Sequence, residues 1–363
     1  MCIFATIMNV NNDILIERLE CWYKLHAREL PWRNTTDAYL IWVSEIILQQ
    51  TRVAQGYDYY VRFIERFPDV VSLAAADSDE VMRYWQGLGY YSRARNMHTA
   101  AKDVVSRFGG VFPSSYDAIR SLKGVGDYTA AAIASFAYNL PHAVVDGNVY
   151  RVLSRLFGID MPIDVPAGKR YFAELAQMLL DRERPGLYNQ AIMEFGALQC
   201  TPGACDCTEC PMQDFCVARA TSRVSLLPVK QGKVAIKTRY FYYFVISCSG
   251  VTWLQRRECN DIWRNLYEYP LIETNEPASF VELQATEAYQ KLFDGVGAIT
   301  IKGEPYTCRH VLTHRIIHAS FYTVEVSNYP PSLSHLQPIN LDDVDAYPVA
   351  RLTELYRQHR DKK

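Results

Sequence analysis

The sequence predicts a chain of two domains that differ in fold class, an all-α domain over residues 1–220 and a smaller α+β domain over residues 239–363. Apolar residues recur at helical spacing through the first part, whereas the second part contains runs rich in aromatic and β-branched residues. Residues 221–238 between them carry four lysines or arginines and no acidic residue, a composition typical of a solvated linker. The length of 363 residues also suits two domains of ordinary size.

Eight segments of the first domain are expected to be helices, because their apolar residues return every three or four positions. They are residues 14–25, 38–50, 53–67, 79–85, 93–108, 129–138, 149–157 and 171–180. The second domain is expected to contain strands over 239–246, 251–254 and 319–326, with one helix over 279–293.

Composition excludes several classes of protein. Hydrophobic residues make up 49% of the chain and charged residues 21%, which is too apolar for a disordered chain. No apolar run approaches the length of a membrane span. A net charge of −2 excludes a protein that coats DNA through bulk positive charge. It does not exclude DNA binding through local basic surfaces. The apolar start, with Met1 and Met8 as alternative initiators, lacks the basic leader of a signal peptide, so we expect a cytoplasmic protein.

Four cysteines in one short segment are the strongest chemical signal. Cys200, Cys207, Cys210 and Cys216 have the spacing C-x6-C-x2-C-x5-C directly after an apolar helix. Thiolates select soft metals, and a single C-x2-C pair favours an iron–sulfur cluster over structural zinc, which usually shows two such pairs. Cys205 falls outside this spacing and is expected to be a bystander. The alternative is a set of scattered buried thiols.

A glycine-containing turn, Lys123-Gly124-Val125-Gly126, joins a short helix over 116–122 to an alanine-rich helix that starts near residue 129. Glycines allow a tight turn whose backbone N–H groups point outward at a helix N-terminus, where a phosphate binds well. Lys123 adds a positive charge. The pattern predicts a helix-hairpin-helix that binds the DNA backbone without reading sequence, with an ordinary turn between two helices as the alternative.

Two carboxylates have the surroundings expected of a catalytic pair. Glu45 shares its helical face with Ile41 and Leu48, so its carboxyl should be poorly solvated and hold a proton near neutrality. Asp146 ends an apolar run just before a predicted helix whose N-cap is either Asp146 or Asn148, and an aspartate there is favoured as the anion by backbone N–H groups. We therefore expect their pKa values to move in opposite directions, giving a proton donor and an anionic stabiliser. An exposed glutamate and a simple capping aspartate are the alternatives.

Taken in order, these features resemble the helix-hairpin-helix base-excision DNA glycosylases, most closely the A/G-specific adenine DNA glycosylases of the MutY family. The resemblance covers nearly the whole chain. It is carried by residues 30–33, 44–51, 87–91, 122–130 and 145–148 together with the cysteine loop. It implies an all-α glycosylase domain with a [4Fe-4S] cluster held by the four cysteines, followed by a Nudix-like α+β domain.

The resemblance also implies roles for the catalytic residues. Glu45 would protonate adenine at N7 and then help to deliver water, while Asp146 would stabilise the oxocarbenium-like sugar. Asn148 and Tyr128 would support this pair. The chemistry is related to glycoside hydrolysis by two carboxylates, because a bond to the anomeric carbon breaks towards a similar cation.

A second set of residues is implied to contact DNA. Thr313 and His314 match a loop of the family that inspects 8-oxoguanine, although the family often has Phe-Ser-His where this chain has Leu312-Thr313-His314. The threonine hydroxyl keeps the ability to hydrogen-bond, whereas Leu312 changes the packing of the loop. The full implied set is Arg33, Gln50, Thr51, Leu88, Tyr90, Lys123, Gly124, Gly126, Thr313 and His314.

Tyr128 separates this chain from bifunctional relatives similar to endonuclease III, which carry a lysine there that forms a Schiff base and cuts the strand. Tyrosine cannot form that imine, so we expect base excision without efficient strand cleavage, unless a nearby amine such as Lys123 intervenes. The expected partner is duplex DNA with adenine opposite 8-oxoguanine or guanine, bound by a monomer at the nucleoid, with no membrane partner.

Three other functions remain as alternatives. An oxidised-pyrimidine glycosylase with lyase activity is disfavoured by Tyr128 and by the long second domain. A non-catalytic iron–sulfur DNA-binding module gives no reason for a buried acid such as Glu45. A Nudix hydrolase would need a glutamate-rich box that holds a divalent metal, and residues 268–293 contain only scattered glutamates.

Overall fold

A computed structural model describes residues 12–203, 205–232 and 235–362, so the question of Met1 or Met8 as the start lies outside the described residues. The chain divides into two compact units. The first, here called the helical unit, contains the residues up to Ala75 and Asn96–Gly232; the second, the sheet unit, contains Ala76–Arg95 and the chain from Lys233 onward. None of the described helices is both long and apolar enough to cross a membrane.

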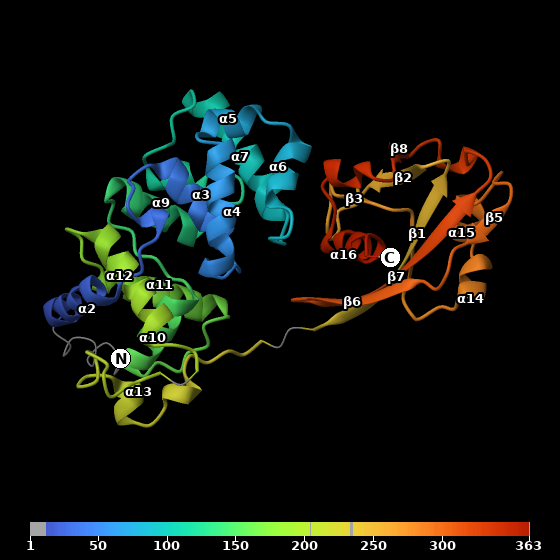
Figure 1. Ribbon diagram of the computed structural model, residues 1–363. Coiled ribbons are helices and arrows are strands. Elements are labelled where there is room, and N and C mark those ends of the chain that lie inside the picture. Colours follow the sequence, from blue (N-terminus) through green and yellow to red (C-terminus); the bar gives the residue numbers. More distant parts are fainter. Residues whose placement is uncertain (1–11, 204, 233–234, 363) are drawn as a thin grey trace. The chain divides into compact units, whose positions relative to one another are not determined.

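The helical unit is built almost entirely from α-helices, coloured blue to yellow-green in Figure 1. Its helices are α2 (Asn12–His26), α3 (Ala38–Ile47), α4 (Val53–Arg66), α5 (Val70–Ala75), α7 (Ser92–Phe108, which starts in the segment assigned to the sheet unit), α8 (Tyr116–Arg120), α9 (Asp127–Tyr138), α10 (Gly147–Phe157), α11 (Pro166–Leu179), α12 (Pro185–Leu198) and α13 (Val217–Ala220). Short 3₁₀ turns lie at Pro31–Arg33 and Val224–Leu226. Apolar side chains of α2, α9, α10, α11 and α12 form one continuous core.

Helix α3 shows why the local sequence folds as it does. Asp37 caps its first turn, because the carboxylate accepts hydrogen bonds from the N–H groups of Tyr39 and Leu40. Apart from Leu40 every residue of the helix is buried, so burial rather than one amphipathic stripe stabilises it. The helix ends three residues earlier than predicted, and Gln50 beyond it adopts a left-handed backbone with φ of 56°.

In its described residues the sheet unit has eight strands, β1 (Lys237–Cys248), β2 (Val251–Arg256), β3 (Tyr267–Glu268), β4 (Leu271–Thr274), β5 (Ile299–Ile301), β6 (Tyr306–Leu312), β7 (Arg315–Val326) and β8 (Gln337–Asn340). Their main order is β3-β2-β1-β7-β5. Strands β1 and β7 pair in parallel, with Tyr242 opposite Ser320, and β6 and β7 form an antiparallel hairpin. The helices are α6 (Ser78–Trp85), α14 (Phe280–Gln284), α15 (Glu287–Leu292) and α16 (Arg351–Arg360), with 3₁₀ turns at Pro331–Leu333 and Asp343–Ala346.

Helices cover both faces of this sheet, with α14 and α15 on one side and α16 on the other (Figure 1). Phe244 of β1 lies 5.6 Å from Tyr289 of α15, and Phe321 of β7 stacks 4.8 Å from Tyr356 of α16, measured between ring centroids. Because both faces are buried, β1 is an almost continuous apolar run rather than an alternating one.

The single helix predicted over 279–293 is wrong in detail, since two helices occupy this region. The Ser279 hydroxyl and Glu282 form a capping box at the start of α14. Thr286 then ends that helix and caps α15, because its hydroxyl accepts a hydrogen bond from the N–H of Tyr289. A second N-cap within the segment therefore divides it.

The segment Ala76–Arg95 belongs to the sheet unit although it lies far from the rest of that unit in sequence. The carboxylate of Asp79 accepts hydrogen bonds from Arg256 at 2.9 Å and from the Tyr267 hydroxyl at 3.1 Å. The side-chain oxygen of Gln86 accepts another from the N–H of Val349 at 3.2 Å. The sheet unit is thus assembled from two separate parts of the chain.

Candidate active site

A cavity of about 530 Å³ in the helical unit collects most of the predicted catalytic residues. It lies among α3, α9, α12 and the first turn of α10, with the segment 28–33 at its edge. Of the residues predicted from sequence, it is lined by Arg33, Glu45, Thr51, Tyr128, Asp146 and Asn148. Side chains that come from widely separated positions therefore share one concave site, with the partly apolar lining typical of a small-molecule or base pocket.

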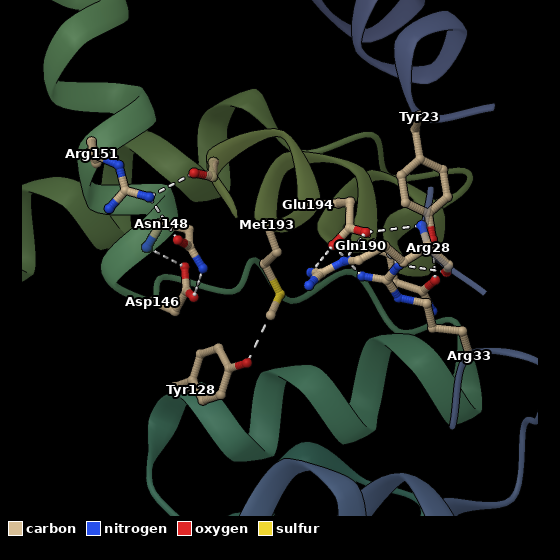
Figure 2. A network of polar contacts seen from close by, with 11 residues as sticks. Tyr23, Arg28, Arg33, Tyr128, Asp146, Asn148, Arg151, Gln190, Met193 and Glu194 are labelled. Carbon is tan, nitrogen blue, oxygen red and sulfur yellow. Dashed lines mark hydrogen bonds and ion pairs between the residues drawn. The ribbon is translucent and has the colours of Figure 1, made fainter. Parts of the chain in front are cut away.

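Glu45 is the buried acid of this cavity. Its side chain is held on α3 between apolar neighbours, and the residue is only 8% exposed. Burial raises the pKa of Glu45 to about 7, with a partial offset from the nearby Tyr128 hydroxyl and a further increase from the Asp146 carboxyl. The Tyr128 hydroxyl itself donates to Sδ of Met193 at 3.9 Å (Figure 2). The group can therefore carry a proton near neutral pH and release it to a bound base, as a general acid requires.

Asp146 is the N-cap of α10, as the sequence suggested. Its Oδ1 accepts hydrogen bonds from the N–H groups of Asn148 at 2.9 Å and Val149 at 2.8 Å, and its Oδ2 accepts one from Nδ2 of Asn148 at 2.8 Å. Burial nevertheless raises the pKa of Asp146, because it outweighs these hydrogen bonds and the charge of Arg151. The prediction that the two carboxyls shift in opposite directions is wrong, since loss of solvent acts on both.

A chain of hydrogen bonds connects Asp146 with the cysteine loop. Figure 2 shows its first part, from Asp146 through Asn148 to Arg151. Oδ1 of Asn148 accepts a bond from Nη2 of Arg151 at 2.7 Å, and Nε of Arg151 donates to the Cys200 carbonyl at 2.6 Å. Gly196 allows this close approach of α10 and α12, because a Cβ there would lie 2.6 Å from Cβ of Asn148. Sequence reasoning missed Arg151, which is separated from Cys200 by 49 positions.

Glu194 forms a second charged centre at the edge of the cavity, which sequence reasoning also missed. Its carboxylate is bound bidentately by Arg28 at 2.7 and 2.6 Å and by Arg33 at 2.9 and 2.6 Å (Figure 2). Burial opposes ionisation, but the bonds to the two arginines outweigh it and lower the pKa of Glu194 to about 2. Beside it the Tyr23 hydroxyl donates to Oε1 of Gln190 at 2.9 Å, so this end of the cavity is polar.

The predicted backbone-binding turn lies between α8 and α9 in the helical unit. Gly124 has a left-handed backbone with φ of 80°, and a Cβ there would approach Cβ of Asn96 to 2.7 Å, so both conformation and packing require glycine. Gly126 is the N-cap of α9 and has an ordinary negative φ. Because glycine has no side chain, the first N–H groups of the helix have no side-chain cap. Lys123 is exposed beside this helix end.

The other predicted DNA contacts lie elsewhere. Gln50 is exposed just after α3, whereas Leu88 and Tyr90 belong to the sheet unit together with Thr313 and His314. Thr313 and His314 form the exposed turn of the β6–β7 hairpin, and the Tyr90 hydroxyl hydrogen-bonds to the Thr313 hydroxyl. The predicted set therefore divides among the cavity, the exposed segment after α3, the α8–α9 turn and the sheet unit.

The predicted cluster ligands lie in the loop between α12 and α13, where all are partly exposed. Nη1 of Arg155 donates to Sγ of Cys200 at 3.3 Å and to Sγ of Cys205 at 3.6 Å, and Cys205 Sγ lies 3.7 Å from Cys207 Sγ. In the described part of the chain no three side chains are arranged as a preformed site for a single ion. A four-iron cluster is wider than one ion, and four thiols beside a buried arginine are the donor set and charge that it requires.

Comparison with known proteins identifies two family models along the chain. Residues 43–178 match the HhH-GPD superfamily of base excision DNA repair proteins, and residues 242–359 match the NUDIX domain. An adenine DNA glycosylase of Mus musculus is 45% identical over 212 residues, which cover 56% of this chain and 41% of that protein. An adenine DNA glycosylase of Buchnera aphidicola subsp. Baizongia pistaciae is 34% identical over 274 residues, covering 73% of this chain and 76% of that protein.

Solved structures resemble the helical part of the chain. A thermostable thymine-DNA glycosylase is 27% identical with a TM-score of 0.55, covering 59% of this chain and 99% of that one. Endonuclease III in a non-covalent DNA complex, 19% identical with a TM-score of 0.51, shares the fold over 59% of this chain and 98% of that one. The chain spans about two-fifths of the mouse relative but three-quarters of the bacterial one. With an HhH-GPD domain followed by a NUDIX domain, the chain belongs to the adenine DNA glycosylase family.

Proposed function

We propose that this protein is a monofunctional DNA glycosylase that hydrolyses the N-glycosidic bond of adenine opposite 8-oxoguanine or guanine in duplex DNA. The observation that carries the proposal is the pairing of a buried, proton-holding Glu45 with the anchored carboxyl of Asp146 in one cavity. A protein that only binds DNA has no need of such a pair, because a buried carboxyl without partners costs free energy.

In the proposed reaction Glu45 donates its proton to N7 of adenine, which leaves as the neutral base when the bond from C1′ to N9 breaks. The sugar then carries oxocarbenium-like charge, which the Asp146 carboxylate stabilises. Water adds to C1′, and its proton returns to Glu45. Asn148 holds Asp146 through its side-chain hydrogen bond, while Tyr128 supports Glu45. The polar end of the cavity around Glu194 and Gln190 offers hydrogen bonds to the flipped base.

The residues proposed to contact DNA have different roles according to where they lie in the structure. The α8–α9 turn with Lys123, Gly124 and Gly126 binds phosphate at the uncapped start of α9. Gln50, Leu88 and Tyr90 fill the gap left by the flipped adenine, Thr51 contacts the DNA beside them, and Arg33 shapes the base pocket. Thr313 and His314 inspect the base opposite.

The cysteine loop is proposed to hold a [4Fe-4S] cluster through Cys200, Cys207, Cys210 and Cys216. When bound, the cluster supplies structural order to the loop. Arg155 supports this assignment, because its buried guanidinium donates to the Cys200 sulfur and so stabilises negative charge there. Iron and sulfide analysis of the purified protein tests it.

The proposed activity is tested with duplexes that carry adenine opposite 8-oxoguanine, adenine opposite guanine, and thymine glycol opposite adenine, with strand breaks measured with and without alkali. Alkali-dependent breaks at adenine alone are expected. Breaks only at thymine glycol would instead support the oxidised-pyrimidine glycosylase, and an absence of product from both adenine duplexes at enzyme excess would refute the proposal.

The rate of adenine excision should depend on pH through Glu45. Its carboxyl must be protonated to act as the acid, and its pKa is about 7, so the single-turnover rate should fall as pH rises above that value, approaching tenfold per pH unit. Measurement of single-turnover rates from about pH 6 to about pH 9 checks this. A rate that stays level or rises across the alkaline half of that range contradicts the role of Glu45.

Because residue 128 is a tyrosine, we expect little covalent enzyme–DNA complex to form. With a phenol at this position there is no amine to form an imine with the abasic sugar, so borohydride should trap only a trace of protein on DNA. Trapping is measured by gel electrophoresis after incubation with the adenine duplex, and the Lys123→Ala variant serves as the control for an intruding amine. Abundant trapping that survives Lys123→Ala would show the prediction to be wrong.

A further inference from the structure

A charged network in the sheet unit supports the β6–β7 hairpin but takes no part in the proposed chemistry. Its centre is Asp261, in the loop between β2 and β3. Oδ2 of Asp261 lies 2.6 Å from Nη2 of Arg239 and 3.3 Å from Nη2 of Arg257. Oδ1 lies 3.4 Å from Nη2 of Arg315. One carboxylate therefore joins three arginines from three different parts of the unit.

Two of these arginines, Arg239 and Arg257, have side chains only 10% and 9% exposed, and each has a second acidic partner. Arg257 binds both carboxylate oxygens of Glu268, at 2.7 and 2.8 Å, and Arg239 binds Glu273 at 2.5 and 2.7 Å. Although burial opposes ionisation of Asp261, its contacts with Arg239 and Arg315 lower its pKa, so it stays charged. Arg239 and Arg257 thus hold Asp261 in place, and Asp261 in turn holds the more exposed side chain of Arg315.

Arg315 is the first residue of β7 and directly follows the Thr313-His314 turn. The same turn is held on a second side, because the N–H of Lys237 at the start of β1 donates to the His314 carbonyl at 3.0 Å. The turn itself is exposed, so its position depends on few contacts: these two at its base and the hydrogen bond between the Thr313 and Tyr90 hydroxyls.

The loop of Asp261 also supports the hairpin by packing. Trp263, only 8% exposed, places its ring 6.0 Å from the ring of His310 on β6. Trp263 and Asn265 have left-handed backbone conformations, with φ of 59° and 67°, which are uncommon for a bulky side chain such as tryptophan. A strained loop persists only where its surroundings hold it, and here the network around Asp261 does so.

We infer that Asp261 is a positioning residue that fixes the Thr313-His314 turn through Arg315 and thereby sets the preference for the base opposite adenine. The inference rests on the proposed function, in which this turn inspects that base. Hydrogen bonds weaken steeply with small changes in distance and angle, so a turn that shifts slightly loses the ability to discriminate while excision itself continues.

The test compares single-turnover excision of adenine opposite 8-oxoguanine and opposite guanine. Asp261→Asn keeps the size of the side chain and removes its charge, and it should reduce the preference for 8-oxoguanine on the order of tenfold. The loss should fall on the 8-oxoguanine duplex, with the rate on the guanine duplex unchanged. Arg315→Gln should have the same effect, and the double variant should lose no more than either single variant.

Glu273→Gln is the matched control, because it removes an acid from Arg239 but makes no contact with Arg315. It should keep the full preference. Arg315, whose side chain is 36% exposed, provides a second variant if Asp261→Asn lowers the folding yield. Equal loss of rate on both duplexes, or equal loss of preference in Glu273→Gln, would overturn the inference.

The inference and the proposed function fail in different ways. If the unmodified protein prefers 8-oxoguanine and both Asp261→Asn and Arg315→Gln keep that preference, only the inference is wrong. If the unmodified protein excises adenine from both duplexes at the same rate, the inspecting role of the turn is wrong and the inference falls with it. If the unmodified protein excises no adenine, the proposed function itself is refuted.

Discussion

Replacing Glu45 by glutamine should reduce adenine excision about a thousandfold, which is within the range measured for loss of a general acid. Glutamine fills the same space in α3 but has no proton to donate to the base. DNA binding should remain, because Glu45 lies inside the cavity, away from the α8–α9 turn that we propose as the phosphate-binding element. Single-turnover kinetics with the 8-oxoguanine duplex and a binding assay with the same DNA measure the two effects separately.

The thermal stability of Glu45→Gln shows whether the variant is correctly folded. The pKa of Glu45 is raised in the folded protein, so as pH rises from 4.5 through about 7 the unfolded chain ionises first and stability is lost. Glutamine removes this cost, which by the cited shift is about 3 kcal/mol above neutrality. Glu45→Gln should therefore melt at a higher temperature than the parent at alkaline pH, and Glu65→Gln on the exposed side of α4 should change neither rate nor melting. A full excision rate in Glu45→Gln would show that the acid is assigned wrongly.

Replacing Asp146 by asparagine should lower the excision rate on the order of a hundredfold or more, as expected when a preorganised charge that stabilises the transition state is removed. Asparagine is as good an N-cap as aspartate, so α10 should keep its start. The variant should bind the duplex normally and fail in the bond-breaking step, which single-turnover measurement detects.

Asp160→Asn is the matched control, since Asp160 is an exposed aspartate just beyond α10 that pairs only with Arg223 among the contacts seen. It should keep the parental rate. Melting of Asp146→Asn should be unchanged or higher, because burial disfavours the charge of Asp146. Unchanged excision in Asp146→Asn, with normal melting, would remove this carboxylate from the mechanism.

The part of the site that could be predicted from sequence is the part set by near neighbours in the chain. Glu45 stands within an unbroken apolar helix, and Asp146 stands at a helix start, so burial of the first and capping by the second follow from local pattern. The pKa of Asp146 could not be predicted, because its burial depends on distant elements that close the cavity. Glu194 was missed for the same reason, although a single glutamate in the apolar segment 185–198 is the same signal that marked Glu45.

The fold shows the same division. Most long helices with regular apolar spacing were predicted close to their observed bounds, but α12 was not among the expected helices and α11 begins five residues before its expected start. Strand β1 and the second part of β7 were predicted from their aromatic and β-branched runs, whereas β6 was missed. Strands β3, β5 and β8 contain only two to four residues, too few to show a period. Their pairing follows from partners elsewhere in the sheet. The grouping of Ala76–Arg95 with residues more than a hundred positions away has no local signal at all.

The divided origin of the sheet unit has a consequence for synthesis and truncation. Residues 76–95 leave the ribosome well before β1 to β8 do. Asp79 and Gln86 therefore lack their partners Arg256, Tyr267 and Val349 until the C-terminal part of the chain is synthesised. A fragment that stops at Gly232 retains the helical unit, but α6 then lacks its hydrogen-bond partners. A fragment that starts at Lys233 lacks α6 itself. The border between the two family models is therefore a poor place to cut this chain, because either fragment separates α6 from its partners.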